Sequence, residues 1–166
     1  MTKRVRIVVA VVVLLTLLGS GVYIATRREG TKKERLTRAE FVAIADTTCA
    51  KAEAAQSRIP LPEGDPLVAD DAQRERWLAA FEKRREIIDK EIRALAAIEA
   101  PKYLFQWKEA IESLDVAAKL LPGVAEAVRQ KDRTQRDTRQ QRISQLGEYA
   151  SLIMRDAGLI VCGSSG

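Results

Sequence analysis

The chain of 166 residues carries 28 basic and 23 acidic side chains and no histidine, which gives a net charge of +5. The lack of histidine removes the commonest metal ligand, the usual general base at neutral pH, and the Ser-His and Cys-His nucleophile pairs. It also excludes the Glu-x-x-His di-iron centres of helical bundles. Carboxylates and lysines remain, so catalysis is not excluded, but no catalytic motif supports it. We expect a protein that is not an enzyme, with no cofactor and no metal.

The basic excess lies at the N-terminus. Residues 1–35 carry eight basic and two acidic side chains, a net charge of +6, whereas residues 36–166 carry twenty basic and twenty-one acidic ones, a net charge of −1. Basic residues beside a membrane span meet anionic lipid headgroups. The rest of the chain is electrically balanced, which argues against a nucleic-acid-binding protein.

Residues 7–26 are twenty consecutive uncharged residues between the basic flank 1–6 and the basic linker 27–36, and twelve of them are Ile, Val or Leu. At about 1.5 Å per residue, a helix of this length spans the hydrocarbon core of a bilayer, which is about 30 Å thick. The aliphatic side chains favour insertion by roughly 4–7 kcal/mol. We therefore predict a single transmembrane helix that anchors the chain in the lipid bilayer. A cleaved signal peptide remains the alternative.

The first helix of the following domain is predicted from the capping-box sequence Thr37-Arg38-Ala39-Glu40 to about Arg58. Apolar and small residues recur behind the cap at helical spacing and mark its buried face: Phe41, Ile44, Ala45, Thr48, Cys49 and Ala52. Three prolines and a glycine between residues 60 and 66 predict a loop.

A second helix is predicted from about Ala69, and Pro101 is expected in the first turn of a third. The core face of the second helix is marked by Trp77, Phe81, Ile88, Ile92, Leu95 and Ile98. Its charged residues are assigned to the other faces: Arg74, Glu75, Lys83, Arg84, Arg85, Glu86, Asp89, Lys90 and Glu91.

The third helix carries a heptad-like apolar seam, and Pro122-Gly123 is expected to end or kink it. The seam consists of Leu104, Trp107, Ile111, Leu114, Ala118 and Leu121. Residues 129–142 are almost free of apolar side chains, and we interpret them as a solvated helical extension around a turn. A basic patch for an anionic lipid or polymer is the alternative interpretation.

The last helix is predicted from a fourth apolar stripe and from Gly158, a natural C-cap that leads into an apolar tail ending at Cys162. The stripe consists of Ile143, Leu146, Ala150, Ile153 and Ala157. No alternation typical of a strand occurs. We predict an all-α fold, in which the transmembrane helix is followed by a four-helix up-down bundle over residues 37–163 and a flexible tail over residues 164–166.

Cys49 and Cys162 lie near opposite ends of this domain. This placement favours a disulfide, which persists only in an oxidising compartment. Two buried unpaired thiols remain the alternative. More basic residues follow the span than precede it, and the positive-inside rule therefore places the domain in the cytoplasm, in conflict with a disulfide.

Three aromatic residues, Trp77, Tyr103 and Trp107, are weak candidates for ligand contacts. Both tryptophans fall on predicted apolar stripes, where core packing is the default role of an indole ring. For Tyr103 the default is a hydroxyl group that finds a partner at the bundle surface. These residues therefore mark a ligand site only if a pocket is found beside them.

Sparse motifs resemble a group of small extracytoplasmic actinobacterial proteins. They are Phe41 with Ala45 and Cys49, Leu95-x-x-Ile98-x-x-Pro101, and Gly158-Leu159-x-x-Cys162-Gly163. Members of that group have an N-terminal lipobox or membrane span, a charged linker and a four-helix domain with a cysteine at each end. This chain lacks the lipobox cysteine. The resemblance implies a Cys49–Cys162 bridge and a domain outside the cytoplasm, and it implies no activity.

We therefore expect a single-pass cell-membrane protein whose extracytoplasmic bundle acts in envelope interaction or binding, with an envelope protein or anionic polymer as partner. The charged faces of the second helix and residues 129–142 are the expected working surfaces. One alternative is an extracytoplasmic small-ligand binder with an apolar pocket near Trp77, Tyr103 or Trp107. The other is a cytoplasmic membrane-tethered scaffold with free thiols. The oligomeric state is not predicted.

Overall fold

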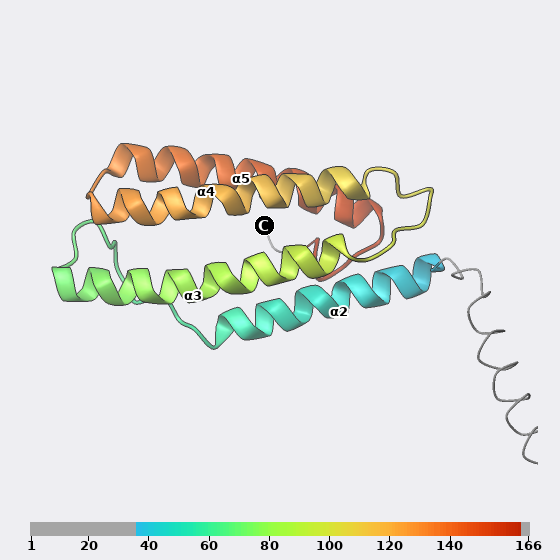
Figure 1. Ribbon diagram of the computed structural model, residues 1–166, viewed down its shortest axis with the longest axis horizontal. Helices are drawn as coiled ribbons and strands as arrows, with labels where there is room; N and C mark the ends of the chain where they lie inside the picture. Colours follow the sequence, from blue (N-terminus) through green and yellow to red (C-terminus); the bar gives the residue numbers. More distant parts are fainter. Residues whose placement is uncertain (1–35, 164–166) are drawn as a thin grey trace, which may run out of the picture. The chain divides into compact units, whose positions relative to one another are not determined.

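A computed structural model describes residues 36–163 of the chain. They form four helices, α2 (Arg38–Ser57), α3 (Asp71–Ala96), α4 (Trp107–Arg129) and α5 (Arg133–Asp156), and include no strand. Successive helices run in opposite directions (Figure 1). The predicted all-α bundle is confirmed. None of the described helices has the length and apolar character needed to cross a bilayer, and the predicted span, residues 7–26, lies outside the described residues.

Side-chain caps set the N-termini of α2 and α3. Thr37 Oγ1 accepts the Glu40 N–H at 3.3 Å, and Glu40 accepts the Thr37 N–H at 2.8 Å, which completes the predicted capping box. Asp70 accepts the Gln73 N–H at 2.7 Å in the same way. Because these side chains satisfy amides that have no partner inside the helix, both helices begin within two residues of their predicted starts.

The expectation that Pro101 lies in the first turn of a helix is wrong, because α4 begins at Trp107. The intervening residues form two consecutive turns. In the first, the Leu104 N–H donates to the Pro101 carbonyl at 2.9 Å, and in the second the Trp107 N–H donates to the Leu104 carbonyl at 3.0 Å. These turns delay the helix until the indole of Trp107 reaches the core.

Of the two outcomes expected at Pro122-Gly123, an end or a kink, the end of the helix is wrong, because α4 passes through Pro122 and continues to Arg129. A proline inside a helix costs about 3 kcal/mol. The turns that follow bury Val124 and Val128 completely, and full burial of a valine side chain contributes about 1.5–3 kcal/mol. The apolar face therefore outweighs the proline, whose own side chain is exposed.

A tight turn joins α4 to α5 inside the basic segment 129–142. Lys131 adopts a left-handed conformation with φ of 57°, and the Asp132 N–H donates to the Ala127 carbonyl at 2.8 Å. Asp132 then caps α5 by accepting the Gln135 N–H at 2.9 Å. The predicted turn within a helical segment is confirmed.

Gly158 ends α5 as predicted, with φ of 95°. The Leu159 N–H donates to the Met154 carbonyl at 3.0 Å, and the Gly158 N–H donates to the Arg155 carbonyl at 2.9 Å, the two bonds of a Schellman motif. Leu159 is buried beyond this turn, whereas Ile160 is exposed. The chain therefore reverses direction after α5 and returns to the bundle.

The bundle is closed by helix packing on three sides. Cα atoms approach within 8 Å between α2 and α3, between α3 and α4, and between α4 and α5, but not between α2 and α5. Buried Ser113 of α4 donates to the Leu146 carbonyl of α5 at 3.0 Å, which marks a close helix crossing. On the fourth side, between α2 and α5, the interior is therefore covered by side chains and the C-terminal segment and not by close helix packing.

Candidate ligand-binding site

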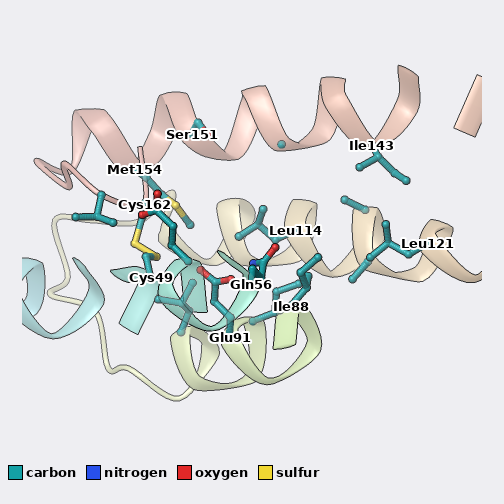
Figure 2. Close-up of a pocket in the computed structure, with 17 residues that line it drawn as sticks. Cys49, Gln56, Ile88, Glu91, Leu114, Leu121, Ile143, Ser151, Met154 and Cys162 are labelled. Atoms are coloured by element: carbon teal, nitrogen blue, oxygen red, sulfur yellow. A yellow bond between two sulfur atoms is a disulfide. The ribbon is translucent and has the colours of Figure 1, made fainter. Parts of the chain in front are cut away.

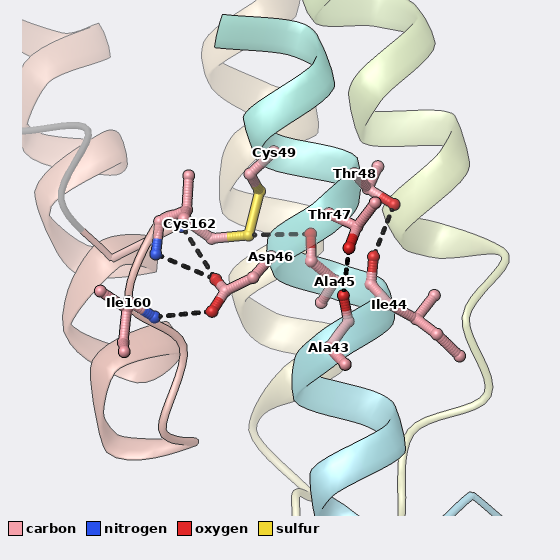
Figure 3. Close-up of a disulfide and its surroundings, with 10 residues drawn as sticks. Ala43, Ile44, Ala45, Asp46, Thr47, Thr48, Cys49, Ile160 and Cys162 are labelled. Atoms are coloured by element: carbon pink, nitrogen blue, oxygen red, sulfur yellow. Dashed lines mark hydrogen bonds between the residues drawn. A yellow bond between two sulfur atoms is a disulfide. The ribbon is translucent and has the colours of Figure 1, made fainter.

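A disulfide joins the C-terminal segment to α2 on the open side of the bundle (Figure 3). Cys49 and Cys162 are linked with a Cα–Cα distance of 5.4 Å, which confirms the predicted bond. The Asp46 carboxylate accepts the N–H groups of Ile160 and Val161 at 3.0 Å each and that of Cys162 at 3.3 Å. A covalent bond and three hydrogen bonds thus hold the segment between α5 and α2.

A cavity of about 390 Å³ lies behind this segment, between the four helices (Figure 2). Each helix and the C-terminal segment contribute to its wall. Apolar and small residues form most of the lining: Cys49, Ile88, Ile92, Leu95, Leu114, Ala117, Ala118, Leu121, Ile143, Gly147, Met154, Val161 and Cys162. Ile143 and Met154 are eleven residues apart on α5, so at about 1.5 Å per residue the cavity follows that helix for about 16 Å.

Four polar side chains complete the lining, and the two that can carry a charge are both acidic. Glu53 and Gln56 come from α2, Glu91 from α3 and Ser151 from α5. No lysine or arginine is among the described residues that line the cavity. The cavity is therefore an apolar trough with two carboxyl groups on its α2–α3 side.

Glu91 is a half-buried acidic residue of the cavity lining. It lies one turn after Ile88 and one turn before Leu95, so it shares their face of α3. Figure 2 shows its carboxyl group reaching, like the amide of Gln56, into the space between the helices. The Glu91 side chain makes no hydrogen bond or ion pair with a described residue. Burial raises the pKa of Glu91 to about 7, and the nearby charge of Glu53 adds to this shift.

Gly147 explains part of the empty space. It lies in the middle of α5, where glycine is about 1 kcal/mol less favourable than alanine. A Cβ atom placed on Gly147 would meet no other atom within 4 Å. The glycine therefore leaves a gap in the α5 wall that any larger side chain would narrow.

The three aromatic candidates do not line this cavity. Trp77 is buried near the other end of α3, where its ring stacks on Phe81 with the centroids 4.9 Å apart. Trp107 is buried against Phe41, edge to face, also at 4.9 Å. Tyr103 lies exposed in the loop between α3 and α4. Both tryptophans are thus core residues, and the cavity of about 390 Å³ is not the pocket that the alternative hypothesis expected near the three aromatics.

Tyr103 and Trp107 do share a smaller hollow of about 140 Å³. It lies at the end of the bundle, and its walls come from the loop before α4 and the last turn of α5. The buried indole Nε1 of Trp107 has no hydrogen-bond partner among the described residues. A hollow of this size is well below the roughly 300–1,000 Å³ of small-molecule sites, and a water is enough to satisfy one N–H.

The basic segment 129–142 is largely neutralised by its neighbours. Four of its six basic side chains form ion pairs with acidic residues, namely Arg129 with Glu126, Lys131 with Asp71, and both Arg133 and Arg136 with Asp65. The pKa of Asp65 is held below its usual range, first by the Leu67 N–H and then by the two arginines. These pairs tie the loop before α3 to α5, and they reduce the charge offered to an anionic polymer.

In the described part of the chain, no three acidic or cysteine side chains are placed so that they could hold a metal ion together. The two carboxyl groups of the cavity lie on different helices and have no third ligand beside them. The chemistry that the trough supports is therefore the enclosure of an apolar group with a polar or charged end near Glu91.

Two residues of this site escaped the sequence analysis. Glu91 was assigned to a charged outer face of its helix, which is wrong, because it lies between Ile88 and Leu95 on the core face and lines the cavity. Gly147 was not singled out. The signals were present in the helical spacing: an acid that interrupts an apolar stripe, and a glycine at the centre of a helix.

Comparisons with known proteins give no further guide, since no protein-family model, no curated protein and no solved structure matches this chain.

Proposed function

We propose that the protein is a membrane-anchored helical bundle that binds a small, mostly apolar ligand between its helices, on the extracytoplasmic side of the membrane and without catalysis. The observation that carries this proposal is the cavity of about 390 Å³ between the four helices. Its size falls within the roughly 300–1,000 Å³ range of small-molecule sites, and an apolar wall with a few converging polar groups is typical of them. A bundle built only for contact with other macromolecules has no need of an interior hollow, because unfilled space costs stability.

The C-terminal segment supports a cavity that persists on the side of the bundle where α2 and α5 do not pack closely. Three helix pairs pack closely, whereas the gap between α2 and α5 is covered by the C-terminal segment. Because that segment is held by a disulfide and by Asp46, the wall is kept in place without close packing of the two helices. The cavity is therefore maintained rather than collapsed.

The test is a binding measurement on the full chain in lipid nanodiscs, with 4-phenylbutanol as a neutral apolar probe and empty nanodiscs as the blank. We expect the wild type to bind the probe and Gly147→Leu to lose binding, because the leucine side chain enters the empty space beside residue 147. Gly147→Ala is the matched control, since it gains the same helix propensity but fills little of the cavity. Equal binding by all three chains would overturn the proposal.

Membrane anchoring and an outer location rest on other observations. The twenty uncharged residues 7–26 have the length of a bilayer span, and the Cys49–Cys162 disulfide requires an oxidising compartment to persist. A membrane-impermeant maleimide added to intact cells tests this location. We expect both thiols to be labelled only after mild reduction. Thiols that react without reductant, and only once the membrane is permeabilised, would place the bundle in the cytoplasm.

The two alternatives have less support. A cytoplasmic scaffold would need free thiols, and the two cysteines are instead joined. An anionic polymer as partner would need an exposed excess of positive charge, whereas four of the six basic groups between residues 129 and 142 already have acidic partners.

A further inference from the structure

The charges around the cavity select among ligands that its apolar walls would accept equally. The α2 wall offers Glu53 and Gln56, the α3 wall offers Glu91, and the α5 wall offers Ser151 as polar groups. The α4 wall and the C-terminal segment contribute no charged side chain. Every charged group that faces the cavity is therefore a carboxyl group.

The Glu91 carboxyl group has no partner of its own among the described residues. A buried polar group without a hydrogen bond costs free energy, and a buried charge without an opposite charge costs more. The neighbouring Glu53 worsens this cost when both groups are charged, because their charges repel. A ligand that brings a positive charge to this place removes both penalties at once.

We propose that the ligand is a cationic amphiphile, whose apolar body fills the trough along α5 and whose protonated amine binds the Glu91 carboxylate, on the α2–α3 side where Glu53 also lines the cavity. This inference rests on the proposed ligand-binding function and specifies its ligand class. The amine donates charge-assisted hydrogen bonds to the Glu91 carboxylate, which are about twice as strong as neutral ones. An anionic amphiphile of the same shape is rejected, because its carboxylate would meet two carboxyl groups and no basic side chain.

A pH dependence follows from this arrangement. Near pH 5 the Glu91 side chain is protonated, since burial has raised its pKa, and an amine gains little there. At pH 8 the Glu91 carboxylate is charged, while an alkyl amine with a pKa near 10.4 still carries its proton. The affinity for the amine therefore rises between pH 5 and pH 8, whereas the affinity for a neutral alcohol stays constant.

The experiment compares three probes of one shape, 4-phenylbutylamine, 4-phenylbutanol and 4-phenylbutanoate, by calorimetry on the full chain in nanodiscs at pH 5 and pH 8. At pH 8 we expect the amine to bind about tenfold or more tightly than the alcohol, as for a hydrogen bond to a charged group. The carboxylate should bind most weakly. Glu91→Gln should remove the preference for the amine and its pH dependence, both read as the ratio of the amine affinity to the alcohol affinity in the same variant.

Glu86→Gln is the matched control, because Glu86 is exposed on the same helix and does not line the cavity. It should keep the preference for the amine, and circular dichroism should show that both variants are folded. Equal binding of amine and alcohol at pH 8, or a preference that survives Glu91→Gln, would overturn the cationic ligand. Binding of the alcohol that is lost in Gly147→Leu would then still support the ligand-binding function, whereas failure of all three probes to bind would overturn both.

Discussion

Glu91 is a side chain that lowers the stability of the fold and belongs to the proposed ligand site. Its position one turn from both Ile88 and Leu95 is one that a leucine would normally fill, and it has no partner among the described residues. Since burial raises its pKa to about 7, the folded state holds a proton that the unfolded chain has already lost above pH 4.5. The folded state is thus penalised as the pH rises from 4.5 towards 7, and the penalty stays at higher pH.

The substitution Glu91→Gln should therefore stabilise the fold at pH 8 but not at pH 4. The gain at pH 8 is about 1–2 kcal/mol in the free energy of unfolding, once screening by solvent at this half-buried site is allowed for. Urea titrations followed by circular dichroism at the two pH values would measure it. Glu86→Gln should change the stability little at either pH, and a Glu91→Gln gain that is the same at pH 4 and pH 8 would contradict the assignment.

At the scale of the helices, neighbouring residues determine where most helices begin and end. Tertiary packing determines the helix boundaries that the prolines did not predict. Thr37, Asp70 and Gly158 act in the structure as their sequence context predicts, because a cap needs only neighbouring residues. The predictions of a helix start at Pro101 and of a helix end at Pro122 failed because tertiary packing decides the outcome there. The loop after Pro101 extends to Trp107, and the burial of Val128 outweighs Pro122, which the usual preferences of proline do not reveal.

The loop before α3 depends on a buried arginine that the sequence analysis placed on an outer face, which is wrong. Arg74 is 6% exposed, and its guanidinium donates to the Pro66 carbonyl at 3.1 Å and to the Ala69 carbonyl at 2.6 Å. It also pairs with Asp71 and lowers the pKa of that carboxyl group. The loop has no regular backbone ladder, so this side chain supplies hydrogen bonds that the backbone does not.

Replacing Arg74 by methionine should lower the free energy of unfolding by about 2–3 kcal/mol, because two carbonyl groups lose charged donors while the apolar stem is retained. Urea denaturation of the full chain would measure the loss. Arg76→Met serves as the control, since Arg76 is exposed and surface substitutions change stability by about 0.5 kcal/mol or less. An Arg74→Met variant as stable as this control would contradict the role of Arg74.

On the scale of the whole molecule, three helix contacts and one disulfide enclose the interior. The bond between Cys49 and Cys162 spans 113 residues, so it restricts nearly the whole domain in the unfolded chain. It also holds two residues of the cavity wall, Val161 and Cys162, against α2. The same bond therefore serves stability and the shape of the site.

Replacing both cysteines by alanine should lower the free energy of unfolding by about 2–4 kcal/mol, as is typical for a long loop. It should also weaken the binding of 4-phenylbutanol, because the Asp46 hydrogen bonds alone must then hold the C-terminal segment. Urea titration and calorimetry on the same preparation would measure the two effects. Unchanged stability with unchanged binding would show that the disulfide has neither role.

The sequence predicted the four helices, their order and the bond between the cysteines, but not the cavity. Helix periodicity identifies which residues face inward, and Ile88, Leu114 and Ile143 were assigned correctly on that basis. Whether inward-facing side chains fill the space depends on the distance between helices, and nothing local fixes the gap between α2 and α5. The sequence analysis considered three aromatic residues as ligand contacts, whereas the cavity is lined by small residues such as Gly147 and Ala118.

The most direct test of the account is to locate a bound ligand. Intermolecular nuclear Overhauser effects would be recorded between 4-phenylbutanol and the methyl groups of the full, methyl-labelled chain in nanodiscs. We predict contacts from the phenyl ring to cavity methyls, in particular those of Ile88, Leu114 and Ile143. Contacts confined to exposed residues such as Val68 and Leu152, or no contacts at all, would contradict a ligand site inside the bundle.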